Sequence, residues 1–151
     1  MIVLVGLPGR GKSFIARKLE LFLNWHGARC KVFNVGRYRR LVAGTASADF
    51  FSSANEEATS ARERVAQAAL EDMFTWLEEP MERMGEVEDW QGVQDSVAVF
   101  DATNSTRKRR EWIGRACRGR EKHPVGLIFV ESLCDDEGLL EDNFRLKVRN
   151  R

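Results

Sequence analysis

The feature that most constrains this chain is a complete GxxxxGK[ST] motif at residues 6–13. Four apolar residues, Ile2–Val5, precede the motif, and an amphipathic stretch follows from Lys12. A phosphate-binding loop needs this order, because the loop joins a buried strand to the first turn of a helix. The alternative, a glycine-rich turn that binds nothing, is much the less favoured interpretation for a complete motif in this context.

The residue types of the loop predict how it would bind ATP. Glycines let successive backbone N–H groups turn toward phosphate oxygens, since no Cβ obstructs them. The following helix start adds the positive end of a dipole. A lysine supplies a mobile charge for the β and γ phosphates, and a serine hydroxyl can ligate Mg²⁺. We therefore expect the nucleotide to be held by Gly6, Gly9, Arg10, Gly11, Lys12 and Ser13.

Short apolar runs alternate with helical patterns along the rest of the chain. The runs predict strands buried on both faces, at Ile2–Val5, Lys31–Asn34, Val97–Phe100 and Val125–Val130. The periodic stretches predict four helices. The first covers Lys12–Trp25, and the second covers Glu56–Leu77 with Asn55 as its cap. A third follows Thr106 and would bury Trp112, Ile113 and Ala116, and a fourth covers Glu137–Val148 with Leu139, Leu140 and Phe144 inward. Residues 78–96 lack clear periodicity and are expected to form a surface excursion. The pattern predicts one α/β domain over residues 1–151, a three-layer P-loop NTPase fold with a mostly parallel sheet and helices on both faces.

Composition narrows the classes of partner. The chain has 24 basic and 23 acidic side chains, a net charge of +1, which argues against a polyanionic partner such as nucleic acid. Its three cysteines are far apart and lack zinc-site spacing, as expected for reduced thiols in the cytoplasm. No apolar run approaches the roughly 20 residues that cross a bilayer. We expect a cytoplasmic protein with no membrane partner.

A second acidic position fits the phosphate loop. Asp101 directly follows the apolar run Val97–Phe100, and Thr103 and Asn104 come next. Open α/β sheets bind ligands at the carboxyl ends of their strands, and P-loop proteins hold Mg²⁺ there with a carboxylate. A simple turn would explain Asp101 equally well in isolation. Beside the phosphate loop, the metal-site interpretation is favoured.

Basic residues at the ends of several elements suggest an anionic acceptor. Arg39 and Arg40 follow the second strand, Arg62 lies early in the second helix, and residues 107–110 open the third. Guanidinium groups bind phosphate in a bidentate manner. A solvated basic helix face accounts for most of residues 107–122, and a nucleic-acid patch is a rival interpretation. We expect one or two functional arginines among bystanders.

Taken in order, the motifs of this chain resemble the kinase domain of the 6-phosphofructo-2-kinase/fructose-2,6-bisphosphatase family. The phosphate loop alone is generic, but the ordered combination is specific and covers nearly the whole chain. After residues 6–13 the matching stretches are residues 33–36 (FNVG), 38–40 (YRR), 50–51 (FF), 55–58 (NEEA), 99–107 (VFDATNSTR), 109–110 (RR) and 130–136 (VESLCDD).

The resemblance implies transfer of the ATP γ-phosphoryl group to the 2-hydroxyl of fructose 6-phosphate, giving fructose 2,6-bisphosphate. It implies catalytic roles for Lys12, Asp101 and Thr103, and Mg²⁺ at Ser13 and Asp101. It also implies that Asn143 lies near the adenine. Fructose 6-phosphate would be held by Thr103, Arg62, Arg109 and one of Arg39 or Arg40.

Some features depart from the family pattern. The family's kinase domain continues past Arg151 with substrate-binding arginine and tyrosine, and its phosphatase half, with an Arg-His-Gly motif, has no counterpart at His26 or His123. The roles of Lys147 and of residues 78–96 stay open, as does the oligomeric state, with a homodimer one alternative. Three other functions stay open: a small P-loop kinase for another metabolite or for polynucleotide ends, an ATP-binding module without catalysis, and, as the weakest alternative, a regulatory interaction domain that uses the acidic residues 78–96.

Overall fold

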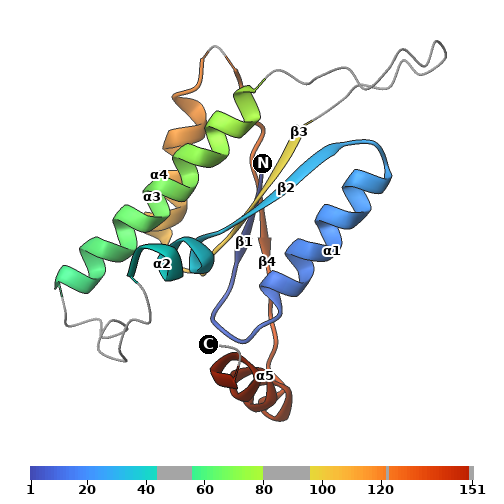
Figure 1. Cartoon of the computed structure of the whole chain (residues 1–151), viewed down its shortest axis with the longest axis vertical. Coiled ribbons are helices and arrows are strands. Elements are labelled where there is room, and N and C mark those ends of the chain that lie inside the picture. The colour runs from blue at the N-terminus through green and yellow to red at the C-terminus, as the bar shows by residue number, and fades with distance from the viewer. Residues whose placement is uncertain (44–55, 80–95, 122, 150–151) are drawn as a thin grey trace.

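The computed structural model describes residues 1–43, 56–79, 96–121 and 123–149 (Figure 1). In chain order its elements are β1 (Ile2–Val5), α1 (Lys12–Trp25), β2 (Arg29–Asn34), α2 (Val35–Ala43), α3 (Glu56–Glu78), β3 (Ser96–Asp101), α4 (Arg107–Arg118), β4 (Ile128–Glu131) and α5 (Glu137–Arg149). The predicted cap Asn55 and nearly all of the predicted excursion lie outside the described residues. Among the described helices, none combines the length and the apolar character needed to cross a membrane.

The four strands form one parallel sheet in the order β2-β3-β1-β4. In the register of the sheet, Leu4 of β1 lies beside Asp101 of β3, and Asn34 of β2 lies on the other side of Asp101. The phosphate loop therefore leaves the sheet next to Asp101. This parallel arrangement confirms the predicted α/β class and brings the predicted site residues of three segments to one edge.

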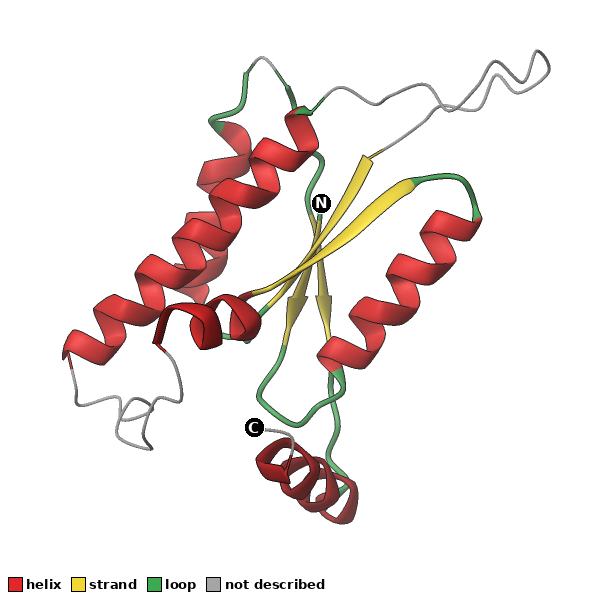
Figure 2. Ribbon diagram, viewed as in Figure 1, coloured by secondary structure: helices red, strands yellow, loops and turns green. Residues whose placement is uncertain are grey.

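Helices α3 and α4 cover one face of the sheet and α1 covers the other, which makes three layers (Figure 2). The α3–α4 face holds the larger core, because α3 presents an apolar stripe to the strands. Burial of each large side chain there contributes about 1.5–3 kcal/mol. The core on this face contains Val3, Phe33, Phe100, Ala69, Leu70, Met73, Phe74, Trp76, Ile113 and Cys117.

The α1 face has a smaller core, formed by Leu4, Ala16, Cys30 and Val99. Helix α1 begins and ends at the predicted residues, and it directs Ile15 and Leu23 toward this core. Several of its other apolar side chains remain exposed to solvent, namely Phe14, Leu21, Phe22 and Trp25.

Three expectations about burial are wrong. Strand β4 is not buried on both faces, since Ile128 is 61% and Phe129 41% exposed. Among the described strands it lies at the end of the sheet, next to β1. Helix α5 leaves Leu139 and Phe144 exposed, because it lies below the sheet edge beside the phosphate loop rather than on a face (Figure 1).

In α4, Ile113 is buried as predicted, but Trp112 and Ala116 are only partly buried at the margin of the core. Gly114 and Cys117 are buried on this helix instead. Helix α2, which starts at Val35 directly after the last residue of β2, was not predicted from the sequence. Its apolar residues Val35 and Tyr38 lie one turn apart and pack against the core, but the helix has only nine residues, which is short for a periodic signal.

Candidate active site

The phosphate loop has the backbone conformation that a cradle of N–H groups requires. Gly6, Gly9 and Gly11 have φ values of 139°, 81° and 77°, a region that L side chains rarely adopt. Gly6 is further restricted by space, because a Cβ on it would lie 2.6 Å from the carbonyl oxygen of Ser132. The loop can therefore keep this conformation beside Ser132 only with glycine at position 6.

Lys12 lies at the centre of the loop and is 8% exposed. Its Nζ donates a hydrogen bond to the Leu7 carbonyl at 2.7 Å. Burial lowers the pKa of the Lys12 ammonium, Lys147 and Arg10 lower it further, and Asp101 opposes them. A poorly solvated ammonium group in a cationic neighbourhood gains more from an added polyanion than an exposed lysine does.

Asp101 and Ser13 come together around a third residue. Asp101 is 3% exposed, and the Asn34 Nδ2 donates a hydrogen bond to its carboxylate. The same Nδ2 lies 3.4 Å from the Ser13 Oγ. One carboxylate and one hydroxyl fit Mg²⁺, which keeps water and phosphate oxygens as its other ligands. Among the described residues, no cluster of three metal-binding side chains offers a site made of protein ligands alone.

The segment after Asp101 is fixed to the phosphate loop. The Gly6 backbone N–H donates to the Thr103 carbonyl at 2.9 Å. Buried Asn104 has a φ of 45° and donates from Nδ2 to the Leu4 carbonyl at 2.9 Å. Arg110 donates to the carbonyls of Asn104 and Ser105. Thr103 is thus held beside the loop with its side chain exposed.

Helix α5 and the segment before it contact the same loop from the β4 side. The Asn143 Nδ2 donates to the Gly9 carbonyl at 2.8 Å, and the Ser132 hydroxyl donates to the Arg10 carbonyl. The Arg10 guanidinium lies 3.5 Å from the Asp135 carboxylate. The structure therefore places Asn143 at the phosphate loop. The role of Ser132 was missed, although the residue belongs to the matching stretch 130–136.

The predicted acceptor arginines are on α2, α3 and α4, within one layer of the fold (Figure 1). Arg109 is half-buried, with its guanidinium 4.9 Å from the Trp112 ring centre. Burial lowers the pKa of Arg109, and Glu63 opposes that effect. The Arg40 Nη1 lies 3.8 Å from where a Cβ on Gly36 would be. Arg39 and Arg62 are half-buried and both make contacts within the protein.

Other basic residues near α4 have structural partners. Arg107 pairs with Glu111 one turn along the helix. Arg110 binds the backbone of the preceding segment. Arg120 binds Glu78 and lies over the Phe74 ring. These three residues therefore make contacts within the protein, and which other members of the basic cluster are functional stays a prediction.

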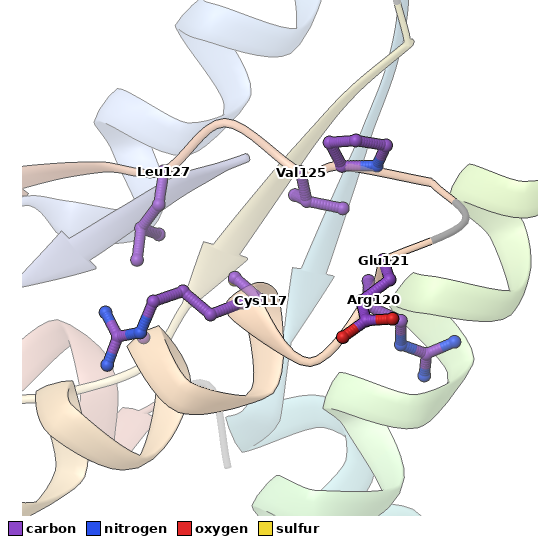
Figure 3. Close-up of a pocket in the computed structure, with 8 residues that line it drawn as sticks. Cys117, Arg120, Glu121, Val125 and Leu127 are labelled. Atoms are coloured by element: carbon purple, nitrogen blue, oxygen red, sulfur yellow. The ribbon is translucent and has the colours of Figure 1, made fainter.

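A cavity of about 390 Å³ lies at the other end of the sheet, between the carboxyl end of α4 and the segment before β4 (Figure 3). Its walls include Cys117, Val125 and Leu127, with Arg120 and Glu121 at the side. No predicted site residue lines it. This cavity therefore does not coincide with the predicted nucleotide site, which lies at the phosphate loop and Asp101.

Comparisons with known proteins agree with the ordered motifs. A sequence model of the 6-phosphofructo-2-kinase family matches residues 1–151. The chain is 48% identical to a 6-phosphofructo-2-kinase/fructose-2,6-bisphosphatase of Arabidopsis thaliana over 98% of its length and 18% of the relative. It is 44% identical to a probable 6-phosphofructo-2-kinase of Schizosaccharomyces pombe, over 97% of this chain and 20% of that one. With 6-phosphofructo-2-kinase/fructose-2,6-bisphosphatase 1 of Homo sapiens the identity is 39%, over 96% and 27%.

The chain therefore spans about a fifth to a quarter of the length of these relatives. Among solved structures, the crystal structure of APE1195 matches 99% of this chain and 71% of that chain with a TM-score of 0.56. Sequence identity in that match is 17%. It supports the fold and carries no information on the reaction.

Proposed function

The chain belongs to the 6-phosphofructo-2-kinase family, and on that premise we propose that it transfers the γ-phosphoryl group of ATP to the 2-hydroxyl of fructose 6-phosphate. The product is fructose 2,6-bisphosphate. The observation that carries the proposal is the meeting of Asp101 and Ser13 at the phosphate loop. These two side chains would hold Mg²⁺ next to the loop, as phosphoryl transfer requires.

On the nucleotide side, the backbone N–H groups of the loop would surround the β and γ phosphates. Lys12 would exchange its bond to the Leu7 carbonyl for the phosphate oxygens. Lys147, which acts electrostatically on Lys12, would add a second positive charge. Arg10 and Asn143 would complete the ATP site, with Asn143 positioned through Gly9.

Ser13 and Asp101 would hold Mg²⁺, whose chemistry here is to neutralise charge on the bridging and γ-phosphate oxygens. Asp101 accepts a hydrogen bond from Asn34 and lies on the metal side, so it is a poor base for the sugar hydroxyl. Loose phosphoryl-transfer transition states need positioning and charge neutralisation more than proton removal. The residues around Asp101 are suited to both.

On the acceptor side, Thr103 would position the sugar next to the γ-phosphate, since its carbonyl is fixed by Gly6 and its side chain is exposed. Arg62, Arg109 and one of Arg39 or Arg40 would bind the 6-phosphate. Burial of Arg109 among apolar neighbours strengthens its attraction for an anion. The three helices that carry these arginines would then set the distance between the acceptor phosphate and the loop.

The test is incubation of the protein with Mg²⁺-ATP and fructose 6-phosphate, with detection of an acid-labile 2-phosphate product. We expect ADP release to depend on fructose 6-phosphate and not on a 5′-hydroxyl oligonucleotide. Binding of ATP without binding or phosphorylation of fructose 6-phosphate would contradict the proposal and favour an ATP-binding module without catalysis. Turnover with the oligonucleotide would favour a polynucleotide kinase.

A further inference from the structure

Asn34 lies where β2 meets α2 and has no role in the site predicted from the sequence. It is the last residue of β2, and α2 starts at the next residue without a connecting loop. In the sheet it is the direct neighbour of Asp101 on β3. A half-buried side chain at this point faces the metal side of the loop while its backbone begins the helix that carries Arg39 and Arg40.

The carboxamide of Asn34 uses both of its ends. Its Nδ2 donates to the Asp101 carboxylate and lies 3.4 Å from the Ser13 Oγ. Its Oδ1 accepts the backbone N–H of Arg37 at 2.9 Å and so caps the first turn of α2. Only an amide has two N–H donors and an acceptor in one short planar group. A carboxylate here would repel the like charge of Asp101. An apolar side chain would leave both the Asp101 carboxylate and the Arg37 N–H without this partner.

The absence of a side chain at position 36 keeps this amide in place. A Cβ on Gly36 would lie 3.0 Å from the Asn34 Oδ1 and 3.8 Å from the Arg40 Nη1. The amide of Asn34 and the guanidinium of Arg40 therefore both lie over Gly36. The amide that binds Asp101 therefore lies close to Arg40, one of the predicted acceptor arginines.

We propose that Asn34 is a positioning residue that holds Asp101 and Ser13 ready for Mg²⁺-ATP and ties them to α2. The proposal rests on the proposed function, because it assigns Asp101 and Ser13 to the metal. Groups that orient metal ligands without touching the metal commonly change metal affinity or activity by about 10- to 100-fold when they are removed. Asn34 is such a group, and it is fixed to the helix that would bind the acceptor.

A purely structural role as a helix cap is the alternative, and two variants separate the roles. Serine caps helices about as well as asparagine, but its hydroxyl is too short to reach Asp101, so Asn34→Ser keeps the cap and loses the donor. Asn34→Ala loses both. Asn24→Ser is the matched control, because Asn24 also bridges two elements, with bonds to the backbone N–H and carbonyl of Cys30.

The measurement is the ratio of the ATP dissociation constant in EDTA to that in Mg²⁺, determined with a fluorescent ATP analogue. We expect this ratio to fall about tenfold in both Asn34→Ser and Asn34→Ala. Thermal stability should fall only in Asn34→Ala and in the control Asn24→Ser. The Asn24→Ser protein should keep the Mg²⁺ dependence of the unmodified chain.

An unchanged ratio in Asn34→Ser would overturn the proposal, whether or not Asn34→Ala is affected. A crystal structure of Asn34→Ser without nucleotide gives a second, independent readout: we expect the Asp101 carboxylate to turn away from Ser13. If the unmodified protein bound no ATP, the proposed function would fail, and the position of Asp101 in that crystal structure would still decide the role of Asn34.

Discussion

The nucleotide half and the acceptor half of the same sheet edge are built in different ways. The nucleotide half consists of a continuous loop whose geometry is fixed by backbone conformation, with Asp101 and Asn34 added from the two adjacent strand ends. The predicted acceptor half would consist of long arginine side chains on three helices. The predicted phosphate cradle is therefore shaped by its own backbone and held by hydrogen bonds to Thr103, Ser132 and Asn143, whereas the predicted acceptor half depends on how α2, α3 and α4 pack together.

The largest expected effect is on the nucleotide half. Replacement of Lys12 by methionine keeps the shape of a buried side chain and removes its charge, so the fold should be retained. We expect ATP-dependent product formation to fall by at least about 10²- to 10³-fold, the usual cost of one stabilising donor at a reacting phosphate or oxyanion. Lys18→Met is the control, since Lys18 lies exposed on the same helix. Near-normal turnover by Lys12→Met would show that the loop does not act as proposed.

The acceptor half should instead be sensitive to its supporting core. Phe74 of α3 is 3% exposed, and truncation of a buried phenylalanine to alanine costs about 3–5 kcal/mol of unfolding free energy. Phe22 of α1 is 55% exposed, so Phe22→Ala should cost less than about 1 kcal/mol. Chemical denaturation of the two variants provides the measurement. Equal losses would contradict the difference between the two faces of the sheet.

This contrast also explains what could be predicted from sequence. The strand–loop–helix unit, the position of Asp101 and the bounds of α1 follow from local patterns, because the phosphate loop and a buried strand each leave a signature of a few residues. The apolar stripe of α3 likewise predicted a buried face, and Val65, Ala69 and Met73 are buried there.

Contacts between distant segments were not predictable in this way. The exposure of β4 depends on its place at the end of the sheet, which no local pattern encodes. Helix α2 is short, and its start is set by the cap at Asn34 directly after a strand, so no long periodic pattern marks it in the sequence. The bridge from Asn34 to Asp101 joins residues 67 positions apart, and an isolated asparagine after a strand is equally consistent with a turn.

A smaller effect is expected from a single acceptor arginine. Arg109→Ala should raise the KM for fructose 6-phosphate about tenfold, since a hydrogen bond to a charged group contributes about 1.5–3 kcal/mol, and should leave ATP binding unchanged. Arg107→Ala is the matched control, because Arg107 is exposed on the same turn and pairs with Glu111. Loss of ATP affinity in Arg109→Ala would mean that the two halves of the site are not separate.

The smallest effect concerns the contact that joins α2 to α3. Burial and a hydrogen bond to Asp72 together raise the pKa of Tyr38 to about 12. Tyr38 is the only tyrosine in the chain, so tyrosinate absorbance during a pH titration reports on this residue alone. We expect a midpoint near 12 in the folded protein, and a lower midpoint in Asp72→Asn.

The raised pKa of Tyr38 also makes the stability of the folded protein depend on pH. The folded pKa of Tyr38 lies above the unfolded value of about 10, so the neutral phenol stabilises the folded state fully below pH 10. This contribution is lost as the pH rises from about 10 through 12. Tyr38→Phe should remove that part of the pH dependence without changing ATP binding. A midpoint near 10 in the folded protein would show that Tyr38 does not hold α2 against α3. The predicted acceptor arginines on α2 would then be positioned without this contact, whereas the phosphate loop is positioned by its own backbone conformation.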